Sequence, residues 1–136
     1  MDSPAPQSFA LVITGAPYSS QAPQTALNFA EAAIRAGHKV NQVFLYGDGV
    51  HLASNFASPP SDESDWPALW RAFIENHQIP ATCCVASALR RGLLDETEAR
   101  RYEKTAANAP YTIAGLGEWL ESTLNSSRTL YFNPDH

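Results

Sequence analysis

The stretch "FALVITGAPYSSQAPQTALNFAEAAIRAGHKVNQVFLYG" (residues 9–47) decides the fold class of this chain. It opens with a continuous apolar and β-branched run, 9–15, which is typical of a strand buried on both faces. Apolar residues then recur at helical spacing from Gln24, and Gly37 stands where a glycine commonly ends a helix. A second predicted strand, 39–47, follows directly. This strand–helix–strand order predicts two parallel strands joined by a right-handed crossover.

The remainder of the chain continues this alternation of strands and helices. The segment "ASPPSDESDWP" (57–67) is predicted to be a long loop, because it is rich in Pro, Ser and Asp. The helix expected after it places four apolar side chains on one face: Leu69, Trp70, Phe73 and Ile74. We then expect a strand at "ATCCVA" (81–86), a helix capped by Asp95, a helix at about 115–124 and a strand at "RTLYF" (128–132). The predicted class is α/β, with four strands in a mainly parallel sheet and helices on both faces.

The composition is that of one compact globular domain. The chain has 136 residues, 44% of them hydrophobic and 17% charged, which suffices for one core. We expect a single domain over 1–136, with residues 1–8 as a loose tail. The net charge of −5 disfavours direct binding of nucleic acid, which requires a basic patch. The sequence contains no secretory signal and no apolar stretch of about 20 residues, so a membrane protein is disfavoured.

Three candidate sites are weak in this sequence. The loop after the first predicted strand contains one glycine and neither of the common phosphate-binding motifs, so a nucleotide site is disfavoured. The acidic loop carries Asp62, Glu63 and Asp65, but it lacks the EF-hand spacing, and a solvated loop is favoured over a cation site. Asp48 and His51 have the chemistry of an acid–base pair. No second signal supports that role, and a loop cap or a surface pair is favoured.

The two cysteines, Cys83 and Cys84, are adjacent. Neighbouring residues have poor geometry for a disulfide, and two cysteines without a Cys-x-x-Cys spacing do not make a zinc site. The four histidines are scattered and add no ligand spacing: His38, His51, His77 and His136. We therefore expect two free thiols in a reducing compartment, and a cytoplasmic location.

Strand geometry predicts different surroundings for the two thiols, because successive side chains on a strand point to opposite faces. Cys83 is expected to pack beneath a helix as a small hydrophobe. Cys84 is nearer the end of the strand, and "VASALRRG" after it reads as a turn into a short helix. A helix N-terminus and the nearby Arg90 and Arg91 favour the thiolate form, which is the nucleophile. The residues alone leave two readings open: two buried structural cysteines, or a nucleophile at Cys84.

The segment "CVASALRRGLLDETEA" (84–99) closely resembles the region around the active cysteine of the DsrE/TusD family. The resemblance extends over residues 9–132, and its most specific part is the cysteine followed by "ALRRG" and "DETEA". It implies a Rossmann-like layered α/β sheet. It also implies a sulfurtransferase that accepts sulfane sulfur as a persulfide on Cys84, not Cys83, and needs no metal or organic cofactor. Arg90 and Arg91 then have two open roles, which are stabilising the anionic sulfur and contacting a partner.

The resemblance is strongest to the TusD branch, which implies a set of partners. These are TusB- and TusC-like subunits in a heterohexamer with two copies of each chain, a TusE-like sulfur acceptor and a persulfide donor protein. The relay would supply sulfur for 2-thiouridine at the wobble position of tRNA, without direct contact between this chain and the nucleic acid. Whether a chain without these partners forms homo-oligomers is left open by the sequence. The alternatives are a DsrE-type carrier in dissimilatory sulfur oxidation and a non-catalytic scaffold subunit.

Overall fold

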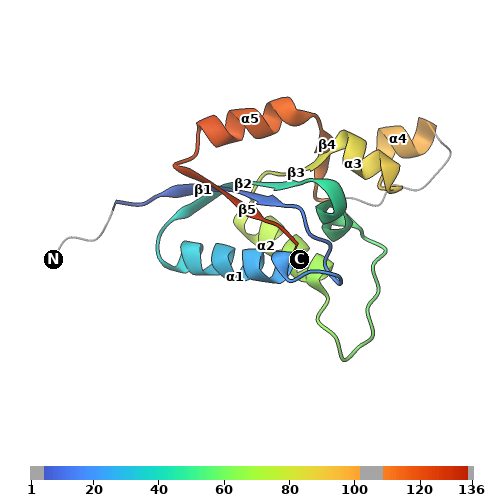
Figure 1. The fold of residues 1–136 in the computed structure, drawn as a ribbon, viewed down its shortest axis with the longest axis horizontal. Helices are drawn as coiled ribbons and strands as arrows, with labels where there is room; N and C mark the ends of the chain where they lie inside the picture. The colour runs from blue at the N-terminus through green and yellow to red at the C-terminus, as the bar shows by residue number, and fades with distance from the viewer. Residues whose placement is uncertain (1–4, 102–108, 135–136) are drawn as a thin grey trace.

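The computed structural model describes residues 5–101 and 109–134, and it is built on one five-stranded sheet (Figure 1). The strand order is β4-β3-β2-β1-β5, and every neighbouring pair is parallel. The strands are β1 (Ser8–Ile13), β2 (Lys39–Leu45), β3 (Ala81–Cys84), β4 (Thr112–Ala114) and β5 (Arg128–Phe132). The last strand thus lies beside the first, and β2 occupies the centre of the sheet.

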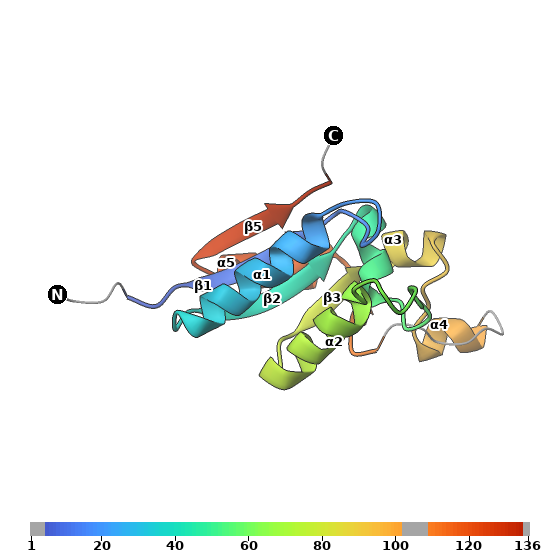
Figure 2. The same cartoon turned by 90° about the horizontal axis from the view of Figure 1, so that it is seen from below.

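Helices cover the two faces of the sheet unequally. The helices of the described residues are α1 (Ala22–Arg35), the 3-10 helix η1 (Gly47–Ala53), α2 (Trp66–His77), α3 (Val85–Arg90), α4 (Glu96–Arg101) and α5 (Leu116–Leu124). Figures 1 and 2 show α1 and α2 side by side on one face, α5 on the other, and α3 and α4 beyond the ends of the strands. The predicted α/β class, with a parallel sheet and helices on both faces, is confirmed. None of the described helices has the length and apolarity to cross a membrane.

The core is divided by the sheet into a large and a small cluster. The large cluster fills the space between the sheet and α1 and α2, and Trp70 is its largest fully buried member. The indole Nε1–H of Trp70 donates to the carbonyl oxygen of Pro23 at 2.9 Å, which joins α2 to the start of α1. The small cluster on the other face consists of Val12, Phe44 and Cys84, with Trp119 of α5 packed against it. Alternating strand residues feed the two clusters, as a pleated sheet requires.

Two predicted helix ends are confirmed in detail. Gly37 adopts a φ of +88°, and its N–H donates to the carbonyl oxygen of Ile34 at 3.0 Å while that of His38 donates to Ala33 at 2.9 Å. This is the Schellman pattern, and it explains why a glycine ends α1. At the other predicted cap, a carboxylate oxygen of Asp95 accepts the backbone N–H of Glu98 at 2.8 Å.

Three predictions about the elements were wrong. The sheet has five strands rather than four, because Thr112–Ala114 adds a short edge strand, β4, to β3. The third strand ends at Cys84 rather than at residue 86, since helix α3 begins at Val85. Leu69 does not share the buried face of α2, because its side chain is 45% exposed.

Candidate functional site

Cys84 lies at the junction of β3 and α3. It is the last residue of the strand and the N-cap of the six-residue helix that follows. Cys83 belongs to the large cluster and is 0% exposed, whereas Cys84 belongs to the small cluster on the opposite face and is 6% exposed. The two free thiols therefore face opposite sides of the sheet, as strand geometry predicts.

The surroundings of Cys83 suppress its reactivity. Burial among apolar side chains raises the pKa of the Cys83 thiol to about 12, and the neighbouring Cys84 adds a smaller effect in the same direction. A thiol with this pKa is almost entirely protonated at neutral pH, and only the thiolate is a good nucleophile. Cys83 is thus an apolar packing residue.

An apolar pocket of about 280 Å³ lies on the same face of the sheet as Cys84. It lies between α5 and the sheet, and its walls are Val12, Thr14, Phe44, Tyr46, Leu116, Trp119 and Tyr131. Cys84 does not line the pocket, but Val12 and Phe44 belong to the cluster that contains Cys84, and Trp119 packs against that cluster. It lies toward the carboxyl ends of the strands, where open α/β sheets bind their ligands.

Sequence reasoning missed the aromatic wall of this pocket. The rings of Phe44 and Trp119 lie 5.9 Å apart, and Tyr46 stacks on Phe44 with ring centroids 6.4 Å apart. A signal was present, because Phe44 and Tyr46 occupy alternate positions of the second predicted strand and so share a face. Nothing in the local pattern indicates that Trp119 and Tyr131 come to the same place.

Arg91 holds α3 against η1. Its Nε atom lies 3.0 Å from a carboxylate oxygen of Asp48, and its Nη1 donates to the carbonyl oxygen of Ser87 at 3.1 Å. The hydroxyl of Ser87 in turn accepts the backbone N–H of Gly47 at 3.0 Å. Arg90, one residue earlier, is exposed and makes no ion pair with any residue in 5–101 or 109–134. The two arginines therefore have different surroundings, and Arg91 has a structural role.

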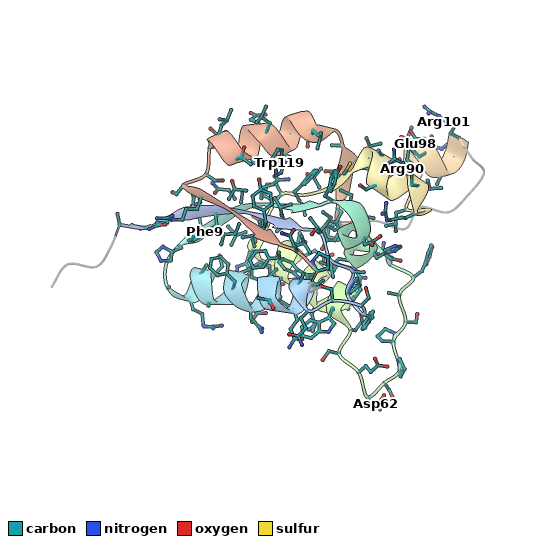
Figure 3. The ribbon with its side chains drawn as sticks, viewed as in Figure 1. Phe9, Asp62, Arg90, Glu98, Arg101 and Trp119 are labelled. Atoms are coloured by element: carbon teal, nitrogen blue, oxygen red, sulfur yellow. The ribbon has the colours of Figure 1, made fainter. Side chains whose placement is uncertain are left out.

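The structure does not bring the other candidate residues to the site. Asp65 is the N-cap of α2, where its carboxylate accepts a backbone N–H. Asp62 and Glu63 are exposed, and Figure 3 shows Asp62 at the tip of the long loop. Asp48 pairs with an arginine rather than with His51. Across the described parts of the chain, no group of three or more His, Cys, Asp or Glu side chains could hold a metal ion.

Known proteins resemble this chain over nearly its full length. The sulfurtransferase TusD of Enterobacter sp. (strain 638) is 42% identical over 126 residues, which cover 91% of this chain and 98% of that protein. The sulfurtransferase TusD of Salmonella typhi is 40% identical with the same coverage. The sulfurtransferase TusD homolog of Pseudomonas aeruginosa is 41% identical over 129 residues, covering 93% of this chain and 98% of that protein.

A solved structure and a family match agree with the similarity to these relatives. The crystal structure of the ychN protein from E. coli matches with a TM-score of 0.71, covering 93% of this chain and 99% of that one. At 20% sequence identity this likeness concerns the fold alone, and it confirms the layered α/β architecture. Residues 7–132, which include the β3–α3 junction, match the family described as DsrE/DsrF-like. The resemblance seen in the sequence is confirmed, and the chain belongs to the DsrE/DsrF-like family.

Proposed function

We propose that Cys84 is the residue on which this sulfurtransferase carries sulfur, as a persulfide. The observation that carries the proposal is the contrast between the two thiols. Cys83 is sealed in the large core with a raised pKa, whereas Cys84 lies on the opposite face, in the small cluster whose Val12 and Phe44 line an apolar pocket. The family resemblance points to the same residue, since "ALRRG" and "DETEA" follow Cys84 at close range.

The reaction is a relay of one sulfane sulfur through two displacements. The Cys84 thiolate attacks the outer sulfur of a donor persulfide, R–S–SH, and forms a new S–S bond while the donor's S–S bond breaks. The donor leaves as a thiolate that takes up the proton, and Cys84 becomes a persulfide anion. An acceptor thiolate then attacks the terminal sulfur, and Cys84 departs as a thiolate. The rates depend on thiolate fraction and access, as in thiol–disulfide exchange, and the relay consumes no external oxidant or reductant.

Intact-protein mass spectrometry tests this assignment. After treatment with a small persulfide donor, the wild-type chain should become one sulfur atom heavier. The Cys84→Ser variant should stay unloaded, and Cys83→Ser is the matched control that should load like the wild type. Loading that persists in Cys84→Ser, or is lost in Cys83→Ser, would refute the assignment.

The proposed pathway is sulfur delivery for 2-thiouridine in tRNA, with TusB- and TusC-like subunits as partners in a heterohexamer and a TusE-like acceptor. The names of the curated relatives support this branch of the family. Contact with tRNA is proposed to be indirect, since the chain has a net charge of −5. The two free thiols favour a reducing compartment, and we place the relay in the cytoplasm.

An exposed row of leucines on α5 supports a partner subunit. Leu116, Leu120 and Leu124 follow one another at intervals of four, so they share one side of the helix, and they are 55%, 53% and 78% exposed. A contiguous exposed apolar surface of this kind is typical of protein interfaces. We expect Leu120→Gln combined with Leu124→Gln to weaken a co-expressed complex with TusB- and TusC-like subunits. Leu69→Gln, on the opposite side of the sheet, is the matched control. Size-exclusion chromatography measures the outcome, and an intact complex in the double variant would remove this support.

A further inference from the structure

We propose that the indole Nε1–H of Trp119 donates a hydrogen bond to the terminal sulfur of the Cys84 persulfide. This hydrogen bond would hold the carried sulfur at the wall of the pocket between α5 and the sheet. The inference rests on the proposed function of Cys84 and assigns a second residue to the same site.

Trp119 is placed over the sulfur-bearing face of the sheet. Figure 3 shows it reaching from α5 toward the strands, where its ring packs on Phe44 with centroids 5.9 Å apart and an interplanar angle of 38°. It packs against the cluster formed by Val12, Phe44 and Cys84. The same side chain lines the apolar pocket on this face of the sheet. Trp119 is therefore part of both the packing around the Cys84 cluster and the wall of the pocket.

The Nε1–H of Trp119 is a buried donor that has no acceptor among the residues that the structure describes. An indole nitrogen can only donate, and a buried donor without a partner destabilises the fold. The fully buried Trp70 shows the usual arrangement, since its Nε1–H donates to a backbone carbonyl. The indole N–H of Trp119 is thus available to an acceptor that is added on this face of the sheet.

The buried polar side chains of Gln42 and Thr82 do not fill the role of that acceptor. The side chain of Gln42 donates to the hydroxyl of Thr82 at 2.7 Å, so these two buried residues are joined to each other. The Cys84 thiol lies in the cluster that Trp119 covers, but its sulfur does not accept the indole N–H. A neutral thiol is also a weak acceptor.

Sulfur loading changes both the reach and the charge of this side chain. The added sulfur stands about 2.05 Å beyond Sγ, the ordinary length of an S–S bond. It carries the negative charge of the persulfide anion, and hydrogen bonds to charged acceptors are shorter and stronger than neutral ones. The indole N–H of Trp119, which makes no hydrogen bond to the thiol, therefore gains an acceptor once Cys84 is loaded. The consequence is that Trp119 favours the loaded over the unloaded state.

The first test measures the loading equilibrium in Trp119→Phe, which keeps an aromatic ring and removes the N–H. Each protein is equilibrated with glutathione persulfide and glutathione at fixed ratios, and the loaded fraction is read by intact-protein mass spectrometry. We expect the equilibrium constant for loading to fall roughly tenfold, as for loss of a hydrogen bond to a charged group. Trp66→Phe is the matched control, because Trp66 is partly buried against the other core cluster. It should stay within about twofold of the wild type.

The outcomes separate this inference from the function it rests on. A Trp119→Phe chain that folds and loads within about twofold of the wild type overturns the role of Trp119 and leaves Cys84 as the carrier. A wild-type chain that does not load at all overturns the proposed function itself.

A second measurement uses the wild-type protein and does not depend on a variant that folds. Sulfur loading should move the indole N–H resonance of Trp119 downfield in a proton–nitrogen NMR spectrum, as expected for a new hydrogen bond to an anion. The resonance of Trp70 serves as an internal reference, because its donor is already bonded. An unchanged Trp119 resonance in the fully loaded protein would also overturn the inference.

Discussion

The sharpest prediction concerns the protection of Cys83 from alkylation. The variant Cys84→Ser leaves Cys83 as the only thiol and keeps the burial that is the larger cause of its raised pKa. At pH 8, a thiol of pKa about 12 is ionised in about one molecule in 10,000, whereas at the ordinary value of about 9 it is ionised in about one in ten. Since only the thiolate reacts, the folded chain should be alkylated about a thousandfold more slowly than the unfolded chain. Cys83 is also 0% exposed, and this burial can only slow the alkylation further.

The assay follows iodoacetamide addition by mass in the folded variant and in the same variant in urea. Between pH 8 and pH 11 the folded rate should rise about tenfold for each pH unit, because the thiolate fraction does so below the pKa. The reciprocal variant, Cys83→Ser, leaves Cys84 in the small cluster on the opposite face, and it should react faster in the folded state than Cys83 does. A folded Cys84→Ser chain that reacts within about tenfold of the unfolded one would refute the assignment of Cys83 as a sealed core residue.

Three further predictions concern stability. Arg91→Ala should lower the free energy of unfolding by up to about 1 kcal/mol, since the ion pair of Arg91 is partly exposed. Arg90→Ala should change the free energy of unfolding by less than about 0.5 kcal/mol. Urea denaturation of both variants checks this. Trp70→Phe should cost about 1–3 kcal/mol, because a buried carbonyl loses its donor, and the melting temperature should fall accordingly. The raised pKa of Cys83 means that the unfolded chain loses this proton at lower pH than the folded chain. The contribution of Cys83 to the free energy of unfolding is therefore fully present below pH about 9. It is lost as the pH rises toward about 12, and the total loss is on the order of 4 kcal/mol. Cys83→Ala should flatten this alkaline fall, measured by denaturation at a series of pH values.

The sequence carries strong signals where structure is local. Gly37 and Asp95 end and begin helices through bonds to residues within a few positions, so their roles are readable from spacing alone. The opposite orientation of Cys83 and Cys84 follows from the period of a strand. By contrast, β4 has only three residues and pairs along one edge, and so short a segment carries no clear period.

The site is less predictable because it is assembled from distant parts of the chain. Tyr131 reaches the pocket only because β5 pairs with β1, an order of strands that local patterns do not encode. Trp119 shares one apolar face of α5 with three leucines that are more than half exposed, so periodicity does not say which of these side chains contacts the sheet. The link between Arg91 and Asp48 spans 43 positions and is likewise invisible to local spacing.

The two-sided placement of the thiols also bears on how long a sulfur atom survives on the carrier. A free thiolate next to a persulfide is ordinarily a competitor. It attacks the inner sulfur, closes a disulfide and expels hydrosulfide, so the cargo is lost to solvent. Here the nearest thiol, Cys83, is separated from Cys84 by the sheet itself and is held in its protonated form. The backbone of β3 thus insulates the loaded sulfur from self-discharge, and a second cysteine is tolerated one residue away.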